Sequence, residues 1–130
     1  MSHEIQRITT EAAPQAIGPY CQAVAHNGLL FCSGQIPIDP QTSAMVEGDI
    51  KAKTRRCLEN LTAVCAEANT SLDRAIKMTV YVKDLALFGD VNEAYAEFFP
   101  SNVPARTTVQ IAALPAGAEV EVNAIVALTG

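Results

Sequence analysis

The feature that most constrains the fold is an abrupt change of hydrophobic period between residues 49 and 83. From Asp49, which suits a helix N-cap, apolar residues recur at the spacing of an amphipathic helix that ends near Asn69. Those residues are Ile50, Cys57, Leu58, Leu61, Val64, Cys65 and Ala68. Residues 76–83 then alternate, with Ile76, Met78, Val80 and Val82 on one side, which predicts a half-buried strand.

A second helical pattern covers roughly residues 85–99, and Pro100 cannot continue it. Further strands are predicted at residues 4–8, 21–26, 29–33, 106–111 and 119–126. The Asn27-Gly28 step favours a hairpin, and Pro115 and Gly117 favour a turn before the last strand.

The order of strands, helix, strand, helix and strands predicts an α+β fold. The natural packing is a mixed or antiparallel sheet with both helices on one face. The other face must then be polar or covered by another subunit, so we expect an oligomer. The length of 130 residues suits a single domain, residues 1–130.

The charge balance excludes several classes of function. The net charge of −5 disfavours nucleic acid as a partner, and the basic residues 51–56 fit the solvated face of a helix. Residues 1–7 lack the apolar core of a signal peptide, and no apolar run approaches the ~18 residues of a membrane span. We therefore expect a cytoplasmic protein that does not bind membranes.

Metal, nucleotide and serine-hydrolase chemistry find no support in the sequence. His3 and His26 have no acidic or thiol partners at metal-ligand spacing, so no metal site is expected. There is no phosphate-binding glycine loop and no Ser-His-Asp candidate set. The four cysteines form no Cys-x-x-Cys pair, and we interpret Cys57 and Cys65 as core packing.

Polar side chains share one side of each of the last two strands. They are Arg106, Thr108 and Gln110 in the first, and Glu119, Glu121 and Asn123 in the second. We expect both stripes to face away from the helices. If they lie side by side, Arg106 could bind a small carboxylate and Glu121 could orient a water or move a proton, as a 2-oxo or 2-imino acid requires. The alternative is a solvated sheet face with a weak surface ion pair.

Three residues in the first third of the chain are further candidates. Tyr20 follows a Gly-Pro corner that can hold an aromatic ring at a fixed angle, but an interface or core tyrosine fits equally well. Ser33 and Gly34 would let the backbone approach a ligand closely, although a turn that ends a strand also explains them.

Taken together, several short strings closely resemble the Rid family, the YjgF-like reactive-intermediate deaminases. The strings are Ile17-Gly18-Pro19-Tyr20, Ser33-Gly34-Gln35-Ile36-Pro37, Tyr81-Val82-Lys83-Asp84-Leu85, Val91-Asn92 and Pro104-Ala105-Arg106-Thr107. The resemblance runs from about Ala12 to Val126, with the blocks in the order and spacing of the family. It implies a chorismate-mutase-like α+β subunit in a homotrimer, with active sites in the clefts between subunits.

The resemblance also implies an activity, the hydrolysis of 2-imino acids such as 2-iminobutanoate and 2-iminopropanoate to 2-oxo acids and ammonia without a cofactor. Arg106 matches the arginine that binds the substrate carboxylate, and Glu121 the glutamate that positions the attacking water. The implied catalytic residues are Arg106, Glu121 and Tyr20, and the implied substrate-binding residues are Ser33, Gly34, Asn92 and Thr108.

The sequence departs from the family pattern in three places. Thr108 stands where some members have cysteine, so no thiol takes part there. Glu119 stands where an aliphatic residue is common, and Asn123 where an acidic residue is common. We assign catalysis to Glu121 rather than Glu119 because its spacing from Arg106 matches the family.

Two alternatives remain open at this point. The substrate could be another enamine, such as 2-aminomuconate, because the lining of the pocket decides this. The protein could also be a non-catalytic holdase or binding protein. An RNA-acting role is disfavoured by the net negative charge and by the lack of interleaved aromatic and basic residues.

Overall fold

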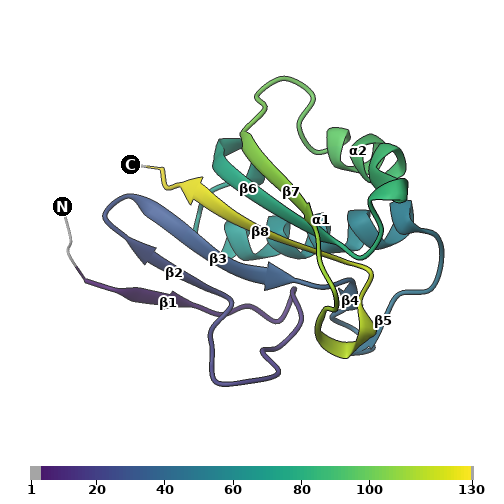
Figure 1. The fold of residues 1–130 in the computed structure, drawn as a ribbon. Coiled ribbons are helices and arrows are strands. Elements are labelled where there is room, and N and C mark those ends of the chain that lie inside the picture. Colours follow the sequence, from purple (N-terminus) through teal and green to yellow (C-terminus); the bar gives the residue numbers. More distant parts are fainter. Residues whose placement is uncertain (1–3, 130) are drawn as a thin grey trace.

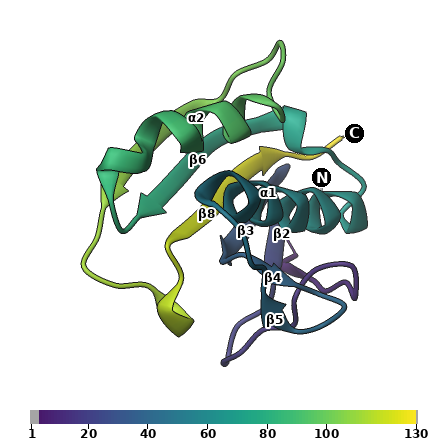
Figure 2. The same ribbon diagram turned by 90° about the vertical axis from the view of Figure 1, so that its right-hand side faces the viewer.

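The computed structural model describes residues 4–129, and its main feature is a six-stranded sheet (Figure 1). The strand order is β1-β2-β3-β8-β6-β7. The strands are β1 (Gln6–Ile8), β2 (Ala23–His26), β3 (Leu29–Gln35), β6 (Ala75–Val82), β7 (Ala105–Gln110) and β8 (Val120–Ala127), and the helices are α1 (Ile50–Glu67) and α2 (Phe88–Ala96). Both helices lie on one face of the sheet (Figure 2). Among the described strands of this sheet only β6 and β7 pair in parallel, so the predicted α+β fold with a mixed sheet and two helices on one face is confirmed.

Helix α1 begins and ends where the sequence predicts. The Asp49 carboxylate accepts a hydrogen bond from the Ala52 N–H at 2.9 Å, and Asn69 ends the helix in the left-handed region with φ 60°. Its apolar stripe packs on β3 and β8, where Leu58, Leu61 and Val64 are completely buried. The expected core positions of Cys57 and Cys65 are confirmed as well.

Strand β6 follows the predicted alternation except at its start. Met78, Val80 and Val82 are buried under the helices, but Ile76 is 49% exposed. The pairing with β8 shifts between Ala75 and Lys77, so Ile76 belongs to a bulge that turns it away from the core.

Helix α2 is shorter than predicted. Residues 85–87 form a separate 3-10 turn, and α2 ends at Ala96 rather than near Phe99. The N–H groups of Phe98 and Phe99 bond to carbonyls three residues earlier, so the last turn tightens well before Pro100.

The described part of the chain has two short hairpins, of which the sequence predicted one. Asn27 and Gly28 have φ values of 50° and 79°, which confirms the predicted tight hairpin between β2 and β3. The hairpin of β4 (Ile38–Asp39) and β5 (Ala44–Met45) was not predicted, because two-residue strands are too short to show an alternation.

The face of the sheet away from the helices is not purely polar. The strand pairing places Phe31 beside Ile125, and Tyr81 beside Val109. Phe31 is 43% exposed and Val109 36% exposed. Large apolar side chains in contact with water on a sheet face favour coverage by another polypeptide.

In the part of the chain that the structure describes, no helix is both long and apolar enough to cross a membrane.

Candidate active site

Glu121 projects from β8 on the open face of the sheet. Its neighbours Val120 and Val122 are completely buried under the helices, and the alternation of the strand turns Glu121 the other way. In the pairing of β8 with β6, Glu121 lies opposite Tyr81.

Gly34 provides the room for the Glu121 carboxylate. Strand β3 has a bulge here, because Ser33 and Gly34 together lie opposite the single residue Asn123. A Cβ atom at position 34 would lie 2.5 Å from Oε2 of Glu121 and 2.8 Å from its Cδ. The φ of Gly34 is outside the left-handed region, so glycine is needed here for space rather than for a backbone angle.

The Glu121 carboxylate also borders a cavity of about 130 Å³. The apolar residues that line this cavity are Pro14, Ile17, Tyr20, Ile36, Ile38 and Pro115. Partial burial raises the pKa of the Glu121 carboxyl, and no cation among residues 4–129 pairs with it. A carboxylate that is desolvated and unpaired beside a small cavity is suited to accept a proton.

The buried amide of Gln22 ties the preceding loop to the sheet. Its Oε1 accepts a hydrogen bond from the Thr10 N–H at 2.6 Å. Its Nε2 donates to the carbonyl oxygens of Thr10 at 3.0 Å and Pro14 at 2.7 Å. One side chain therefore fixes the start of the loop that carries Tyr20.

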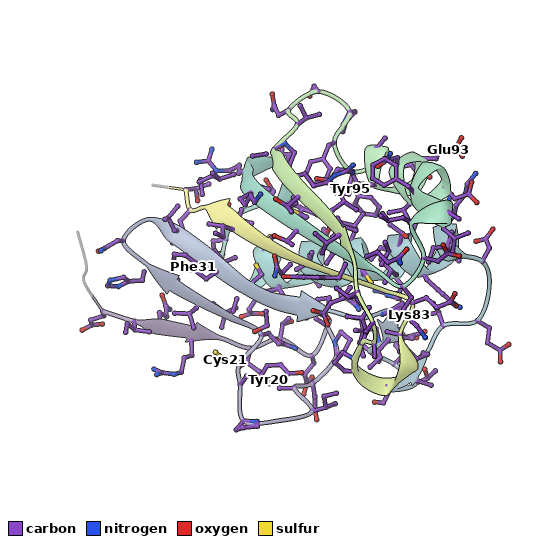
Figure 3. The ribbon with its side chains drawn as sticks, viewed as in Figure 1. Tyr20, Cys21, Phe31, Lys83, Glu93 and Tyr95 are labelled. Atoms are coloured by element: carbon purple, nitrogen blue, oxygen red, sulfur yellow. The ribbon has the colours of Figure 1, made fainter. Side chains whose placement is uncertain are left out.

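Tyr20 and Ser33 lie at the same end of the molecule as the cavity. The Tyr20 hydroxyl accepts a hydrogen bond from the Ile17 N–H at 3.3 Å, so the ring folds back over the Gly-Pro corner. The Ser33 hydroxyl donates to the carbonyl oxygen of Cys21 at 2.7 Å. Figure 3 shows Tyr20 and Cys21 close together in the loop before β2.

Arg106 lies on the opposite face of the sheet, so the prediction that its polar stripe and that of Glu121 face the same way is wrong. Arg106 and Thr108 pair with Met78 and Val80, which are buried under the helices. Strand β6 also separates β7 from β8, so the two stripes are not neighbours. The alternation itself is as predicted, but the pairing with β6 decides which side of β7 faces the helices.

Aromatic rings of α2 hold the Arg106 guanidinium. Its Cζ lies 4.7 Å from the ring centroid of Tyr95 and 5.5 Å from that of Phe88, within the range of cation–π interactions. No carboxylate in the described part of the chain pairs with it. Figure 3 shows Tyr95 and Tyr20 well apart, in the helix layer and in the loop before β2 respectively.

Three buried polar atoms lie on the two elements that hold Arg106. Asn92 Oδ1, Tyr95 OH and Thr108 Oγ1 are the buried side-chain oxygens or nitrogens without a hydrogen-bond partner in residues 4–129. An unsatisfied buried polar group costs roughly 1–3 kcal/mol, so such groups usually meet a partner. All three lie on α2, whose rings contact the Arg106 guanidinium, or on β7, which carries Arg106.

Glu119 does not lie where it could replace Glu121 as the proton acceptor beside the cavity. It was expected on the same face as Glu121, but it precedes the first residue of β8, and its carboxylate pairs with Lys53 of α1. This ion pair compensates the charge of Glu119 on the helix side, whereas Glu121 is left unpaired on the open face.

The structure therefore brings Tyr20, Ser33, Gly34 and Glu121 to one region, and Asn92, Arg106 and Thr108 to another. Sequence reasoning missed Gln22, Phe88 and Tyr95 as parts of these regions. The helical spacing indicates Phe88 and Tyr95 as apolar positions of α2, but no signal in the sequence pairs them with Arg106.

No group of three or more His, Cys, Asp or Glu within residues 4–129 is arranged to hold a metal ion, and His3 lies outside the described residues.

Burial raises the pKa of the Cys57 thiol, so this side chain is held in its un-ionised form in the core.

Comparisons with known proteins agree with this architecture. The model of the family described as Endoribonuclease L-PSP matches residues 10–128. A RutC family protein of Pyrococcus horikoshii is 49% identical over 118 residues, which cover 91% of this chain and 94% of the relative. The 2-iminobutanoate/2-iminopropanoate deaminase of Salmonella typhimurium is 44% identical over 121 residues, with 91% of this chain and 94% of the relative covered.

Among solved structures, the protein YyfA of Yersinia pestis, described as a member of the Rid family, is 44% identical. It superposes with a TM-score of 0.93 over 96% of this chain and 100% of its own. Fold and geometry define a small α+β protein with two candidate half-sites, an acidic one at Glu121 and a basic one at Arg106, on opposite faces of the sheet. The chain belongs to the Rid family.

Proposed function

We propose that this protein hydrolyses 2-imino acids, such as 2-iminobutanoate and 2-iminopropanoate, to 2-oxo acids and ammonia. The observation that carries the proposal is a pair of complementary, unpaired charges. Among residues 4–129, Arg106 has aromatic neighbours and no acidic partner, and Glu121 borders a cavity and has no cationic partner. A substrate carboxylate would supply the missing partner of Arg106, and a reacting water the missing partner of Glu121. The name of the 44% identical Salmonella relative supports the same substrate class.

We further propose that each site forms between two subunits of a homotrimer. In one chain the guanidinium and the carboxylate lie on opposite faces of the sheet, so a single subunit cannot present both to one small molecule. Arg106 lies on the edge strand β7, whereas Glu121 lies on an open face that also exposes Phe31 and Val109. Docking the β7 edge of one subunit against the open face of the next would cover those side chains and join the half-sites.

The reaction then follows from the two half-sites. Arg106 binds the carboxylate of the protonated imine through two hydrogen bonds, which fixes the position of its C2 carbon. Glu121 of the partner subunit takes a proton from a water molecule as its oxygen adds to C2. Glu121 returns this proton to the nitrogen of the tetrahedral intermediate and then takes the proton of the new hydroxyl group as the C–N bond breaks. Ammonia leaves and the 2-oxo acid forms, so one protonated imine and one water give one 2-oxo acid, one ammonia and one proton, which Glu121 releases to solvent. Asn92 Oδ1 accepts a hydrogen bond from the imine nitrogen, which would satisfy that buried atom.

The test couples a threonine dehydratase to this protein and traps the released imine with semicarbazide. The wild-type protein should suppress the trapped product, because it converts the imine before the trap reacts. The substitution Arg106→Ala should abolish most of this effect, since it removes the charge that holds the substrate.

The matched control is Arg55→Ala, which removes the same side chain from the surface of α1, where it pairs with Glu97. This variant should suppress trapping like the wild type. If neither the wild type nor the control affects trapping, the imine-deaminase proposal is wrong, and 2-aminomuconate is the next substrate to assay.

A further inference from the structure

The Arg106 guanidinium is positioned without any negatively charged partner among the described residues. Its contacts are the rings of Tyr95 and Phe88, at 4.7 Å and 5.5 Å from Cζ. A carboxylate at this place would compete with the carboxylate of the substrate. An aromatic ring attracts the cation through its electron-rich face and leaves the donating N–H groups free.

The two rings differ in how firmly they are held. Tyr95 is 7% exposed and packs against Phe99 with the two rings tilted by 35° and 4.8 Å between their centroids. Phe88 is 38% exposed and is the first residue of α2. Because a buried cation–π contact is stronger than an exposed one, the contact of Arg106 with Tyr95 is the stronger of the two.

We propose that Tyr95 is a positioning residue of the carboxylate-binding half-site. Its ring orients the Arg106 guanidinium for two parallel hydrogen bonds to a substrate carboxylate. Arginine has a long flexible side chain, and a fixed ring restricts it before the ligand arrives, which lowers the entropic cost of binding. This inference rests on the proposed function, because it assumes that the ligand of Arg106 is a 2-imino or 2-oxo acid.

The experiment measures the affinity of the protein for 2-oxobutanoate, the expected product, by calorimetry, together with the KM for the imine. The substitution Tyr95→Phe keeps the ring and should change either value by less than about twofold. The substitution Tyr95→Leu removes the ring and should weaken binding and raise KM by about 5- to 30-fold, with a smaller change in kcat. The neutral ligand 2-oxobutanamide should bind all variants alike, since it lacks the charge that Arg106 recognises.

Two further variants separate positioning from packing. The substitution Ile8→Ala removes a buried side chain from β1, at the opposite edge of the sheet from β7, so it should lower the melting temperature and leave KM unchanged. Incorporation of pentafluorophenylalanine at position 95 keeps the ring shape but removes the negative ring face. It should raise KM as Tyr95→Leu does, even if the leucine variant fails to fold.

The outcomes are distinguishable. If Tyr95→Leu and the fluorinated protein bind 2-oxobutanoate like the wild type, the inference is overturned. An equal loss in Tyr95→Phe and Tyr95→Leu would also overturn it, because the hydroxyl would then be responsible. If the wild type does not hydrolyse imines but its carboxylate binding depends on both Arg106 and Tyr95, the proposed function fails and the positioning role stands.

Discussion

At the residue scale, the environment of Glu121 determines when it can act as a base. Burial beside the cavity raises the pKa of this carboxyl above its ordinary range. We expect kcat/KM to fall on the acid side as Glu121 takes up a proton, at a higher pH than an ordinary glutamate would give. The substitution Glu121→Gln should abolish this acid-side fall in kcat/KM and lower kcat by about 10²- to 10⁴-fold. Glu119→Gln is the control and should leave the pH profile intact, because its carboxylate pairs with Lys53.

The same residue should reduce the stability of the protein at neutral pH. Because the folded-state pKa of Glu121 is raised, folding favours its protonated form, and that contribution to stability is lost as the pH rises through the folded pKa. We expect Glu121→Gln to melt at a higher temperature than the wild type at pH 7, and this difference to shrink below the pKa of unfolded glutamate. Thermal melts at pH 7 and pH 4 check this, and a difference that grows on acidification would contradict it.

Gly34 should control where the Glu121 carboxylate lies. The substitution Gly34→Ala would put a methyl group 2.5 Å from Oε2, so the flexible side chain must move away. We expect a change in unfolding free energy below about 1 kcal/mol, since only the end of a side chain is displaced. We also expect a loss of kcat of at least about tenfold, since the base leaves its position.

The control adds the same methyl group where there is room. A Cβ atom at Gly89 in α2 meets nothing within 4 Å, so Gly89→Ala should keep kcat and stabilise the helix slightly. A crystal structure of Gly34→Ala with Glu121 unmoved and full activity would show that this glycine does not shape the site.

At the scale of elements, the loop that carries Tyr20 depends on a single buried amide. The substitution Gln22→Leu would leave the N–H and carbonyl groups of Thr10 and the carbonyl of Pro14 without partners. We expect a loss of about 1–3 kcal/mol in unfolding free energy. Amide hydrogen exchange in residues 10–20 should accelerate more than in the sheet. Gln41→Leu, in an exposed turn, should change neither quantity.

The elements themselves were largely predictable, because their signals are local. Asp49 caps α1, its apolar stripe sets the buried face, and Asn27-Gly28 sets the hairpin turn. What the sequence cannot show is the pairing between distant strands. Arg106 and Thr108 alternate with their neighbours as predicted, but β7 takes its orientation from β6. For the same reason the bulge at Gly34 and the contact of Arg106 with Tyr95 were not foreseen.

At the scale of the whole molecule, the separation of the half-sites predicts complementation between inactive variants. Arg106→Ala and Glu121→Gln should each be inactive alone. When the two are unfolded together, mixed in equal amounts and refolded, random trimers should contain intact residues at about a quarter of the sites. Activity should therefore recover to about a quarter of the wild-type value, measured by imine trapping. No recovery in trimers that contain both variants would argue against sites shared between subunits.

Because Arg106 and Glu121 lie on opposite faces, a defective gene copy should also affect the sites of normal chains. In the proposed trimer each chain contributes its arginine to one site and its glutamate to another. A defective copy that lacks both residues but still assembles would therefore disable two sites, not one. A cell that makes equal amounts of normal and doubly defective chains should keep far less than half of its activity, so such an allele would act as a dominant one.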